Sequence, residues 1–315
     1  MLCFLSFEKV GRKQKDQRAD VWDMMQYTVL DLEWNGVYSE KLGEFINEII
    51  QFGAVRLDEK CRRIGNFSTF VRPSESRKLT GLVRQLTNIT NEDLLTGVPF
   101  MQALKDFQAF SADSILLTWG PCDMRELITN FRFYTGKTEL PLENDYVNLQ
   151  DYCQIALGEP LNKQMGLSAA AERLGISSAE MTLHRAIDDS ILSAACFERV
   201  FDAARLQKMR LPIDQRFCER MVFRAQYLTD LKNPLVDHKQ LQFSCPECGG
   251  ELHQEKAWEI HNRHFFTHFT CPQCQKTFQA RVQYKQRYDG VQVRRRIAEK
   301  RPESEGQTEV SENED

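Results

Sequence analysis

The segment YTVLDLEW, residues 27–34, is an apolar run that carries two acidic side chains, Asp31 and Glu33. A run of this kind predicts a buried strand, in which successive side chains leave opposite faces. Asp31 and Glu33 therefore share one face, and Leu32 points the other way into the core. Two carboxylates at the end of a buried strand are costly unless cations or protons compensate them. Hard divalent ions such as Mg²⁺ or Mn²⁺ are the natural compensation.

A further acidic residue follows a second apolar strand. The segment SILLTWGPCD, residues 114–123, ends in a Gly-Pro turn and Asp123, and the segment after it has helical spacing. Asp123 is therefore predicted at a strand-to-helix junction, where functional sites often lie. Taken alone, Asp123 could equally be the N-cap of that helix.

The third motif is HRAIDD, residues 184–189, in a segment with helical apolar spacing. A carboxylate here would join the first two motifs only if it lay on the correct face of the helix. By helical angle, Asp188 lies nearer to the face of His184 than Asp189 does. Geometry alone therefore does not choose between the two aspartates, and His184 by itself could be an ordinary helix-surface histidine.

In combination, LDLEW, NEIIQFGAV, TWGPCD and HRAIDDS resemble the DEDDh group of the ribonuclease T and DNA polymerase III epsilon-subunit exonuclease superfamily. The resemblance covers residues 26–203, more than half of the chain. The last family motif is His, four residues, Asp, which selects Asp189. The resemblance implies release of nucleoside 5′-monophosphates from a 3′ end, with two Mg²⁺ or Mn²⁺ ions bound by the residues that match the family's acidic positions: Asp31, Glu33, Asp123 and Asp189.

The physical chemistry agrees with that implication. Two cations about 3.5–4 Å apart stabilise both the attacking and the leaving oxygen of an in-line displacement. A neutral imidazole at His184 can take the proton of the attacking water. The alternatives are a non-catalytic protein that binds nucleic acid or acts as a scaffold on an exonuclease fold, and a proofreading exonuclease that acts on DNA.

One departure from the proofreading type lies just before Asp123. Trp119-Gly-Pro-Cys122 stands where many DNA-acting members carry an Asn. In this the chain is similar to Eri-type RNA exonucleases and to bacterial proteins of the KapD type, which favours single-stranded RNA over DNA as substrate. Trp34 is a candidate for stacking on the terminal base, with ordinary core packing as the alternative.

Two Cys-x-x-Cys pairs with 22 residues between them form a second strong feature. Four thiolates complete a closed tetrahedral shell, so the pattern predicts a zinc ribbon with one structural Zn²⁺. Disulfide pairing is the alternative, although the other six cysteines show no pairing pattern. Four nearby histidines are expected to line ribbon strands. The predicted zinc ligands are Cys245, Cys248, Cys271 and Cys274.

A basic run follows the second pair. Residues 281–301 hold eight basic and two acidic side chains, with Tyr284 and Tyr288 among them. Such a run can neutralise phosphates while its rings stack bases, so Arg281 and Arg287 are candidate substrate-binding residues. One alternative is that the run is a solvated polar strand without a binding role. Another is that it docks onto a protein partner.

Length and composition complete the expectations. The net charge of −4 means that attraction to nucleic acid must be local, and no apolar stretch reaches 18 residues, which argues against a membrane span. The cysteines show no disulfide pattern and residues 1–23 lack the features of a signal peptide, which together favour a cytoplasmic location. The expected organisation is a disordered or mis-assigned extension at 1–23, with Met24 as a candidate start, an exonuclease domain at 24–205, a helical connector at 206–243, a zinc ribbon at 244–296 and a disordered acidic tail at 297–315.

The predicted fold class is α/β. Three strands at about 26–32, 49–57 and 66–72 precede a helix at 99–110 and a strand at 114–119. Short connections favour an antiparallel meander followed by strand-helix units. The result is a mixed sheet flanked by helices, which agrees with the ribonuclease H-like fold that the resemblance implies, plus the small C-terminal ribbon.

Overall fold

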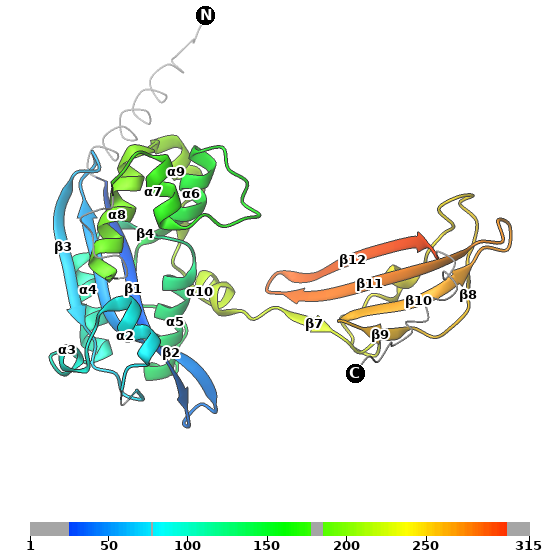
Figure 1. Cartoon of the computed structure of the whole chain (residues 1–315), viewed down its shortest axis with the longest axis horizontal. Helices are drawn as coiled ribbons and strands as arrows, with labels where there is room; N and C mark the ends of the chain where they lie inside the picture. Colours follow the sequence, from blue (N-terminus) through cyan, green and yellow to red (C-terminus); the bar gives the residue numbers. More distant parts are fainter. Residues whose placement is uncertain (1–24, 77, 178–184, 301–315) are drawn as a thin grey trace, which may run out of the picture. The chain divides into compact units, whose positions relative to one another are not determined.

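The computed structural model describes residues 25–76, 78–177 and 185–300 (Figure 1). The chain divides into two compact units, Met1–Val222 and Phe223–Asp315. The predictions for residues 1–23 and for His184 lie outside the described residues, as does the acidic tail beyond Lys300. Among the helices that the structure describes, none combines the length and apolar character needed to cross a membrane.

The first unit is built on a mixed six-stranded sheet with the order β3-β2-β1-β4-β5-β6. Neighbours are antiparallel from β3 to β1, parallel from β1 to β5, and antiparallel again at β6. This is the predicted meander followed by strand-helix units, and the predicted fold class is confirmed. The strands are β1 (Gln26–Ser39), β2 (Glu44–Leu57), β3 (Arg63–Phe70), β4 (Ser114–Thr118), β5 (Asp145–Asn148) and β6 (Leu211–Pro212).

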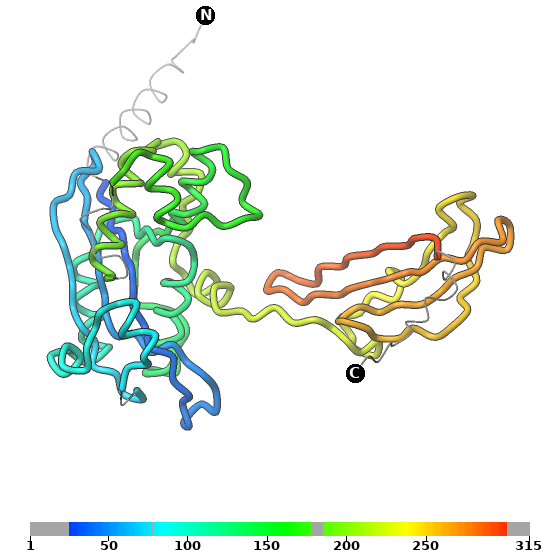
Figure 2. Tube along the Cα trace, in the orientation of Figure 1, coloured from blue at the N-terminus to red at the C-terminus, as the bar shows by residue number. Residues whose placement is uncertain are grey.

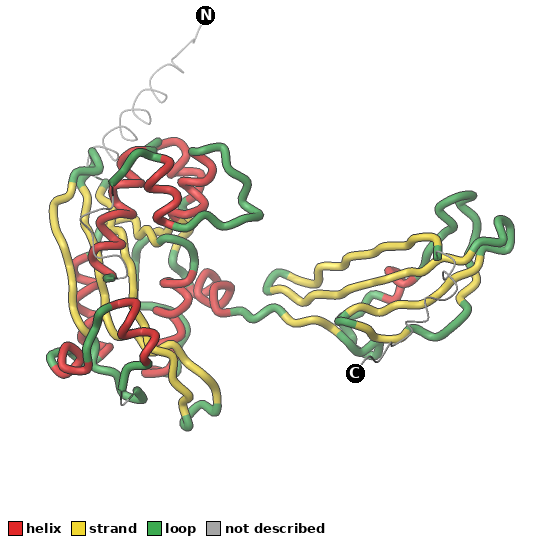
Figure 3. The backbone as a smooth tube through the Cα atoms, in the orientation of Figure 1, coloured by secondary structure: helices red, strands yellow, loops and turns green. Residues whose placement is uncertain are grey.

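Helices cover both faces of this sheet (Figure 3). Their apolar side chains form two cores with the side chains of the strands. Leu30 and Leu32 of β1 belong to a core shared with α4, α5 and α10. Tyr27 and Val29 belong to a second core, shared with α6, α8 and α9. The helices are α2 (Gly81–Thr87), α3 (Asn91–Leu95), α4 (Phe100–Phe110), α5 (Cys122–Thr135), α6 (Leu149–Ala156), α7 (Leu167–Arg173), α8 (Ala186–Arg199), α9 (Ala203–Met209) and α10 (Gln215–Val222).

The second unit is an antiparallel sheet in which β12, β11, β10 and β8 follow one another, with β7 on β11 and β9 on β10 (Figure 2). Side chains of β11 alternate, so that Phe278, Ala280, Val282 and Tyr284 are buried on one face. The elements are β7 (Gln226–Leu228), the 3₁₀ helix η1 (His238–Leu241), β8 (His253–Gln254), β9 (Glu259–His261), β10 (His264–Thr270), β11 (Thr277–Arg287) and β12 (Gly290–Glu299).

The segment predicted as a helical connector, 206–243, is divided between the two units. Its first half includes α10, where Phe217 joins the core that contains β1. Its second half includes β7, which pairs with β11, and Leu241, which is buried in the second unit. The prediction placed these apolar residues in a separate connector because their packing partners lie far away in the sequence. At the other end, β12 continues to Glu299, three residues beyond the expected end of the ribbon.

A buried carboxylate fixes the loop after β3. Glu48 of β2 is fully buried and accepts hydrogen bonds from the backbone N–H groups of Ser74, Glu75 and Ser76 and from the hydroxyl of Tyr134, the last at 3.1 Å. Burial alone would raise the pKa of Glu48, but these hydrogen bonds outweigh it and lower the pKa below its usual value. The ionised side chain is therefore part of the folded structure.

We expect Glu48→Gln to lower the free energy of unfolding at pH 7 by about 1.5–3 kcal/mol, because several charge-assisted hydrogen bonds are weakened together. A depressed folded-state pKa stabilises the protein above the unfolded-state pKa, and this contribution is lost as pH falls through the folded-state value. Urea unfolding at pH 7 and pH 3 checks both points, with the exposed Glu40→Gln as matched control. A difference between Glu48→Gln and the wild-type chain that is equally large at both pH values would contradict this account.

Candidate active site and metal centre

Three of the predicted acidic residues meet at one point of the first unit. Carboxylate oxygens of Asp31, Glu33 and Asp189 all lie within 4.8 Å of one another. Asp31 and Glu33 leave the same face of β1, as their spacing predicts, while Leu32 between them is buried in the core. Asp189 comes from the first turn of α8. An arrangement of this kind can bind divalent cations, because carboxylate oxygens are hard ligands.

Asp123 lies close enough to this group for its charge to raise the pKa of both Asp31 and Glu33. It lies in the first turn of α5, is only 5% exposed, and accepts a hydrogen bond of 3.0 Å from the backbone N–H of Leu32. The parallel pairing of β1 with β4 ends at Leu30, so β4 no longer covers β1 at this point. Asp123 therefore fixes the start of α5 to the strand that carries Asp31 and Glu33.

A glycine allows α8 to approach the sheet closely enough to bring in Asp189. Gly53 of β2 lies directly opposite Asp31 in the antiparallel register. A Cβ atom at Gly53 would lie 2.1 Å from the carbonyl carbon of Ala186, in the first turn of α8. Ser190 closes the contact by donating a 2.8 Å hydrogen bond to the carbonyl oxygen of Gly53. The QFG sequence within the second strand was the available signal, but its partner cannot be identified from spacing.

The strand pairing is irregular at the same place. The register of β1 with β2 shifts between Glu33 and Trp34, so that Gln51 faces Glu33 and Ile49 faces Trp34. Bulges of this kind often lie next to functional sites, because they turn side chains away from the regular alternation. Trp34, the candidate base-stacking residue, is half-buried and packs against the core that contains Leu32.

Burial and mutual repulsion make the carboxylates resist ionisation. Burial, followed by the charges of Asp123, Glu33 and Asp189, raises the pKa of Asp31 well above its usual range. Burial and the charges of Asp189 and Asp123 raise the pKa of Glu33 to about 8. Burial also raises the pKa of Asp123 to about 7, although hydrogen bonds from Leu32 and its own backbone oppose this shift. Bound cations would reverse these shifts, so the chemistry of the donor set fits divalent metal.

The structure also distinguishes between the two aspartates of α8. Asp189, and not Asp188, belongs to the group with Asp31 and Glu33. Arg185, the residue before the first turn of α8, was not predicted from the sequence, and its positive charge opposes the rise in the pKa of Glu33. His184 lies outside the described residues.

The four predicted zinc ligands meet in the second unit. Their sulfur atoms all lie within 4.8 Å of one another, and the four cysteines are free of disulfides. Cys248 and Cys271 sulfurs are 3.6 Å apart, and those of Cys245 and Cys274 are 4.0 Å apart. A disulfide needs about 2.05 Å, whereas a tetrahedral ion with bonds of about 2.3 Å places its sulfurs about 3.8 Å apart. The cluster is thus consistent with a zinc ribbon.

Hydrogen bonds shift the pKa values within the cluster in opposite directions, and those with the neighbouring cysteines raise the pKa of Cys274 to about 12. The backbone N–H of Cys274 lies 3.4 Å from the sulfur of Cys271, and hydrogen bonding of this kind lowers the pKa of Cys271 to about 7. The histidines lie on ribbon strands, as predicted: His253 on β8, His261 on β9, and His264 and His268 on β10.

The basic run of the sequence lies on β11 and β12. Arg281 and Arg287 are both exposed on β11, and the side chain of Arg287 donates to Gln292 at 2.9 Å. The prediction of two stacking tyrosines is wrong for Tyr284, which is fully buried and whose hydroxyl donates to the backbone of Asp237. Tyr288 packs its ring against Phe223, with centroids 5.9 Å apart. Strand alternation places Tyr284 on the core face, a direction that the composition of the run does not reveal.

Comparison with known proteins shows that the first unit is similar to exonucleases. The family model RNase_T, described as Exonuclease, matches residues 28–197. The chain is 28% identical over 191 residues to a probable 3′-5′ exonuclease KapD of Bacillus subtilis, covering 58% of this chain and 89% of that protein. It is also 28% identical over 172 residues to the DNA polymerase III subunit epsilon of Buchnera aphidicola, covering 52% of this chain and 68% of that protein.

Among solved structures, the nuclease domain of 3′hExo, described as a DEDDh family member bound to rAMP, is 22% identical with a TM-score of 0.47. That match covers 55% of this chain and 90% of the other. A structure described as 3′-end specific recognition of histone mRNA stem-loop by 3′-exonuclease is 21% identical, also with a TM-score of 0.47, over 56% of this chain and 82% of the other.

We expect Gly53→Ala to reduce metal-dependent activity at least about tenfold, because the new methyl group would overlap the backbone of α8 and displace Asp189. Gly81→Ala is the matched control, since a Cβ at Gly81 meets nothing within 4 Å. Nuclease assays on both variants, with circular dichroism to check folding, measure the effect. Full activity in a folded Gly53→Ala protein would show that the close approach is not needed.

The cysteine cluster generates a separate prediction. The purified chain should contain one zinc ion, and Cys248→Ser should lose most of it, because removing one thiolate breaks the tetrahedral shell. Cys122→Ser, which replaces an exposed cysteine outside the cluster, should keep the full zinc content. The zinc content of the three proteins, measured by elemental analysis, tests this prediction. Equal zinc in all three would rule out this ligand set.

Proposed function

This chain belongs to the RNase_T exonuclease family, whose members include 3′-5′ exonucleases, and on that premise we propose that it degrades single-stranded nucleic acid by a two-metal mechanism. The products would be nucleoside 5′-monophosphates. The observation that supports this most directly is the convergence of Asp31, Glu33 and Asp189 within 4.8 Å, beside the buried Asp123.

The proposed ligands of two Mg²⁺ or Mn²⁺ ions are Asp31, Glu33, Asp123 and Asp189. When bound, such ions supply charge stabilisation to the attacking and leaving oxygens of a phosphodiester displacement. His184 is proposed to take the proton from the attacking water, a role that suits a neutral imidazole near pH 7. Trp34 is proposed to contact the terminal base. Zinc is proposed as the ion of the four-cysteine cluster, with a structural role.

RNA is the proposed preferred substrate over DNA. The support is the sequence Trp119-Gly-Pro-Cys122 before Asp123, in place of the Asn found in many DNA-acting relatives. A DNA proofreading exonuclease is the second candidate, and the 28% identity to a DNA polymerase III epsilon subunit favours it. The nine described cysteines are all free of disulfides, which supports a reducing, cytoplasmic location.

Product analysis of 5′-labelled single-stranded RNA and DNA of equal sequence tests the proposal. The purified chain with Mg²⁺ or Mn²⁺ should give a ladder that shortens from the 3′ end. Asp189→Asn should lower the rate at least about 100-fold, because it removes a proposed metal ligand. Asp188→Asn is the matched control, since the neighbouring carboxylate lies outside the metal-binding group, and it should stay within about threefold of the wild-type rate.

Each outcome discriminates between the candidates. Faster degradation of DNA than RNA would favour the proofreading type. Binding of either strand without metal-dependent cleavage would favour a non-catalytic protein on an exonuclease fold. Equal losses in Asp188→Asn and Asp189→Asn would contradict the proposed ligand set.

A further inference from the structure

The second unit presents an exposed sheet face whose chemistry differs from that of its buried face. The buried face of β11 is apolar, whereas the side chains that alternate with it are Gln279 and Arg281, followed by Gln283. The register with β10 and β12 extends this outward surface over three strands. We call it the arginine face and define it by six residues: His264, Phe266, Gln279, Arg281, Arg294 and Arg296.

Three arginines dominate this face. Arg281 lies directly opposite Arg296, and Arg294 lies opposite Gln283 on the same pair of strands. Like charges directly opposite one another destabilise a sheet, so the arrangement has an energetic cost that a bound anion would remove. Within the described residues, none of these three arginines forms an ion pair. Within the part of the chain that the structure describes, the face is therefore a cationic surface.

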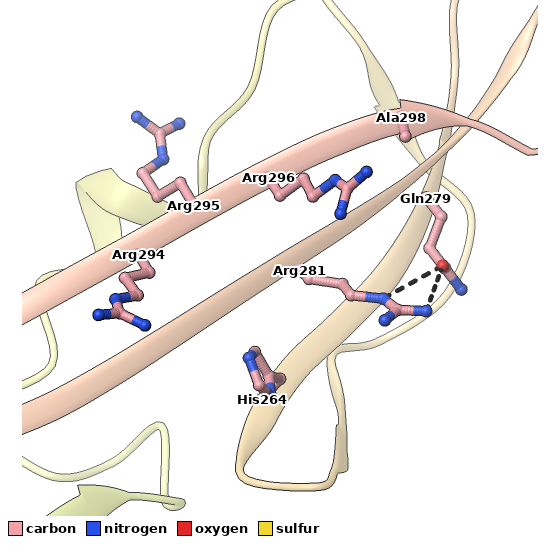
Figure 4. Close-up of a pocket in the computed structure, with 7 residues that line it drawn as sticks. All are labelled: His264, Gln279, Arg281, Arg294, Arg295, Arg296 and Ala298. Atoms are coloured by element: carbon pink, nitrogen blue, oxygen red, sulfur yellow. Dashed lines mark hydrogen bonds between the residues drawn. The ribbon is translucent and has the colours of Figure 1, made fainter. Parts of the chain in front are cut away.

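Arg295, which lies between Arg294 and Arg296, has a structural role. Arg295 points to the other side of β12, where its guanidinium lies 4.5 Å from the ring centre of Phe243 and donates to the backbone of Gln242. In Figure 4, Arg294 and Arg295 leave β12 on opposite sides. Arg295 thus packs on an aromatic ring, whereas Arg294 and Arg296 belong to the arginine face.

The face is hollowed and partly preorganised. A cavity of about 360 Å³ is lined by His264, Gln279 and the three arginines of the face, together with Arg295 and Ala298 (Figure 4). Gln279 accepts two hydrogen bonds from the guanidinium of Arg281, at 2.9 and 3.3 Å, and so holds it in place over the sheet. Holding a long side chain in position lowers the entropy that binding must cost.

Aromatic rings border the arginines. Phe266 of β10 lies opposite Arg281 in the register, and its ring centre is 6.4 Å from that of His261 and 6.2 Å from that of His268. A second cavity of about 480 Å³ is lined by His261, Phe266 and Arg281 together with three further residues. Flat rings beside guanidinium groups can stack nucleobases while the arginines bind phosphates.

We propose that the arginine face binds the phosphate backbone and bases of single-stranded nucleic acid. The proposal rests on the proposed nuclease function and assigns its substrate a second contact outside the carboxylate site. An acidic peptide would satisfy the arginines but would leave the rings of Phe266, His261 and His268 without a stacking partner. The combination of charge and rings therefore favours nucleic acid.

Binding of a fluorescent 20-nucleotide single strand to the full-length chain tests the proposal, by anisotropy at several salt concentrations without added Mg²⁺. The triple variant Arg281→Gln, Arg294→Gln, Arg296→Gln should weaken binding at least tenfold. It should also lower the magnitude of the slope of log K against log salt by about 2, since each phosphate contact on a single strand contributes about 0.7. Phe266→Ala should weaken binding about fivefold or more and leave that slope unchanged.

The matched control is Lys232→Gln, Lys239→Gln, Lys256→Gln, which removes the same charge from exposed positions of the second unit outside β10, β11 and β12. It should bind like the wild-type chain. Equal effects of the two triple variants would show that only net charge matters and would overturn the proposal. Retained zinc in both variants shows that the unit is still folded.

Two further measurements separate this proposal from its premise and from its rival. Metal-dependent shortening of the same 20-mer reports on the carboxylate site, so its absence in the wild-type chain would refute the nuclease function, while binding without Mg²⁺ would still test the arginine face. If the 20-mer is shortened but the arginine variant binds it normally, the face is not a substrate site. Arginine-dependent binding of a labelled ten-residue glutamate peptide with unchanged oligonucleotide affinity would instead assign the face to an acidic protein.

Discussion

The close approach of α8 to β2 at Gly53 is the constraint on which the first unit depends. Because Gly53 faces Asp31 in the register, the first turn of α8 passes over the sheet beside the acidic strand. Asp189 can then join Asp31 and Glu33 within 4.8 Å. Both the fold and the site thus rest on a contact between two backbones, which only a residue without a side chain permits.

That contact creates an electrostatic problem that the fold does not solve by itself. Asp31, Glu33, Asp123 and Asp189 repel one another in a partly desolvated place, and the pKa values of the first three are raised by burial first and by the neighbouring charges second. Among the described residues, Arg185 opposes the shift at Glu33, and the N–H of Leu32 supports Asp123. A buried acidic group of this kind is stable as an ionised cluster only with cations. The repulsion among these carboxylates is what would favour the binding of cations here.

Much of this could be predicted from the sequence, because the signals are local. The alternation in YTVLDLEW places Asp31 and Glu33 on one face, and the Cys-x-x-Cys pairs bring four sulfurs together, as the structure finds. The missing parts depend on contacts between distant segments. Gly53 gives no sign of facing Ala186, the apolar residues of 206–243 do not show which core they join, and the basic run does not reveal that Tyr284 points inward. The periodicity of a segment predicts which way its side chains point. Which distant residues those side chains contact is determined by tertiary packing.

Under the two proposals, the two units would bind a polyanion by opposite means. In the first, clustered carboxylates would require cations before they can meet a phosphate, so affinity there would depend on metal. In the second, Arg281 and Arg296 are paired across two strands and carry their positive charge permanently. A chain with both features would hold a strand through arginines whether or not metal is present, and would cut it only when metal is bound. The net charge of −4 hides this division, because the charges that matter are separated into two local sites.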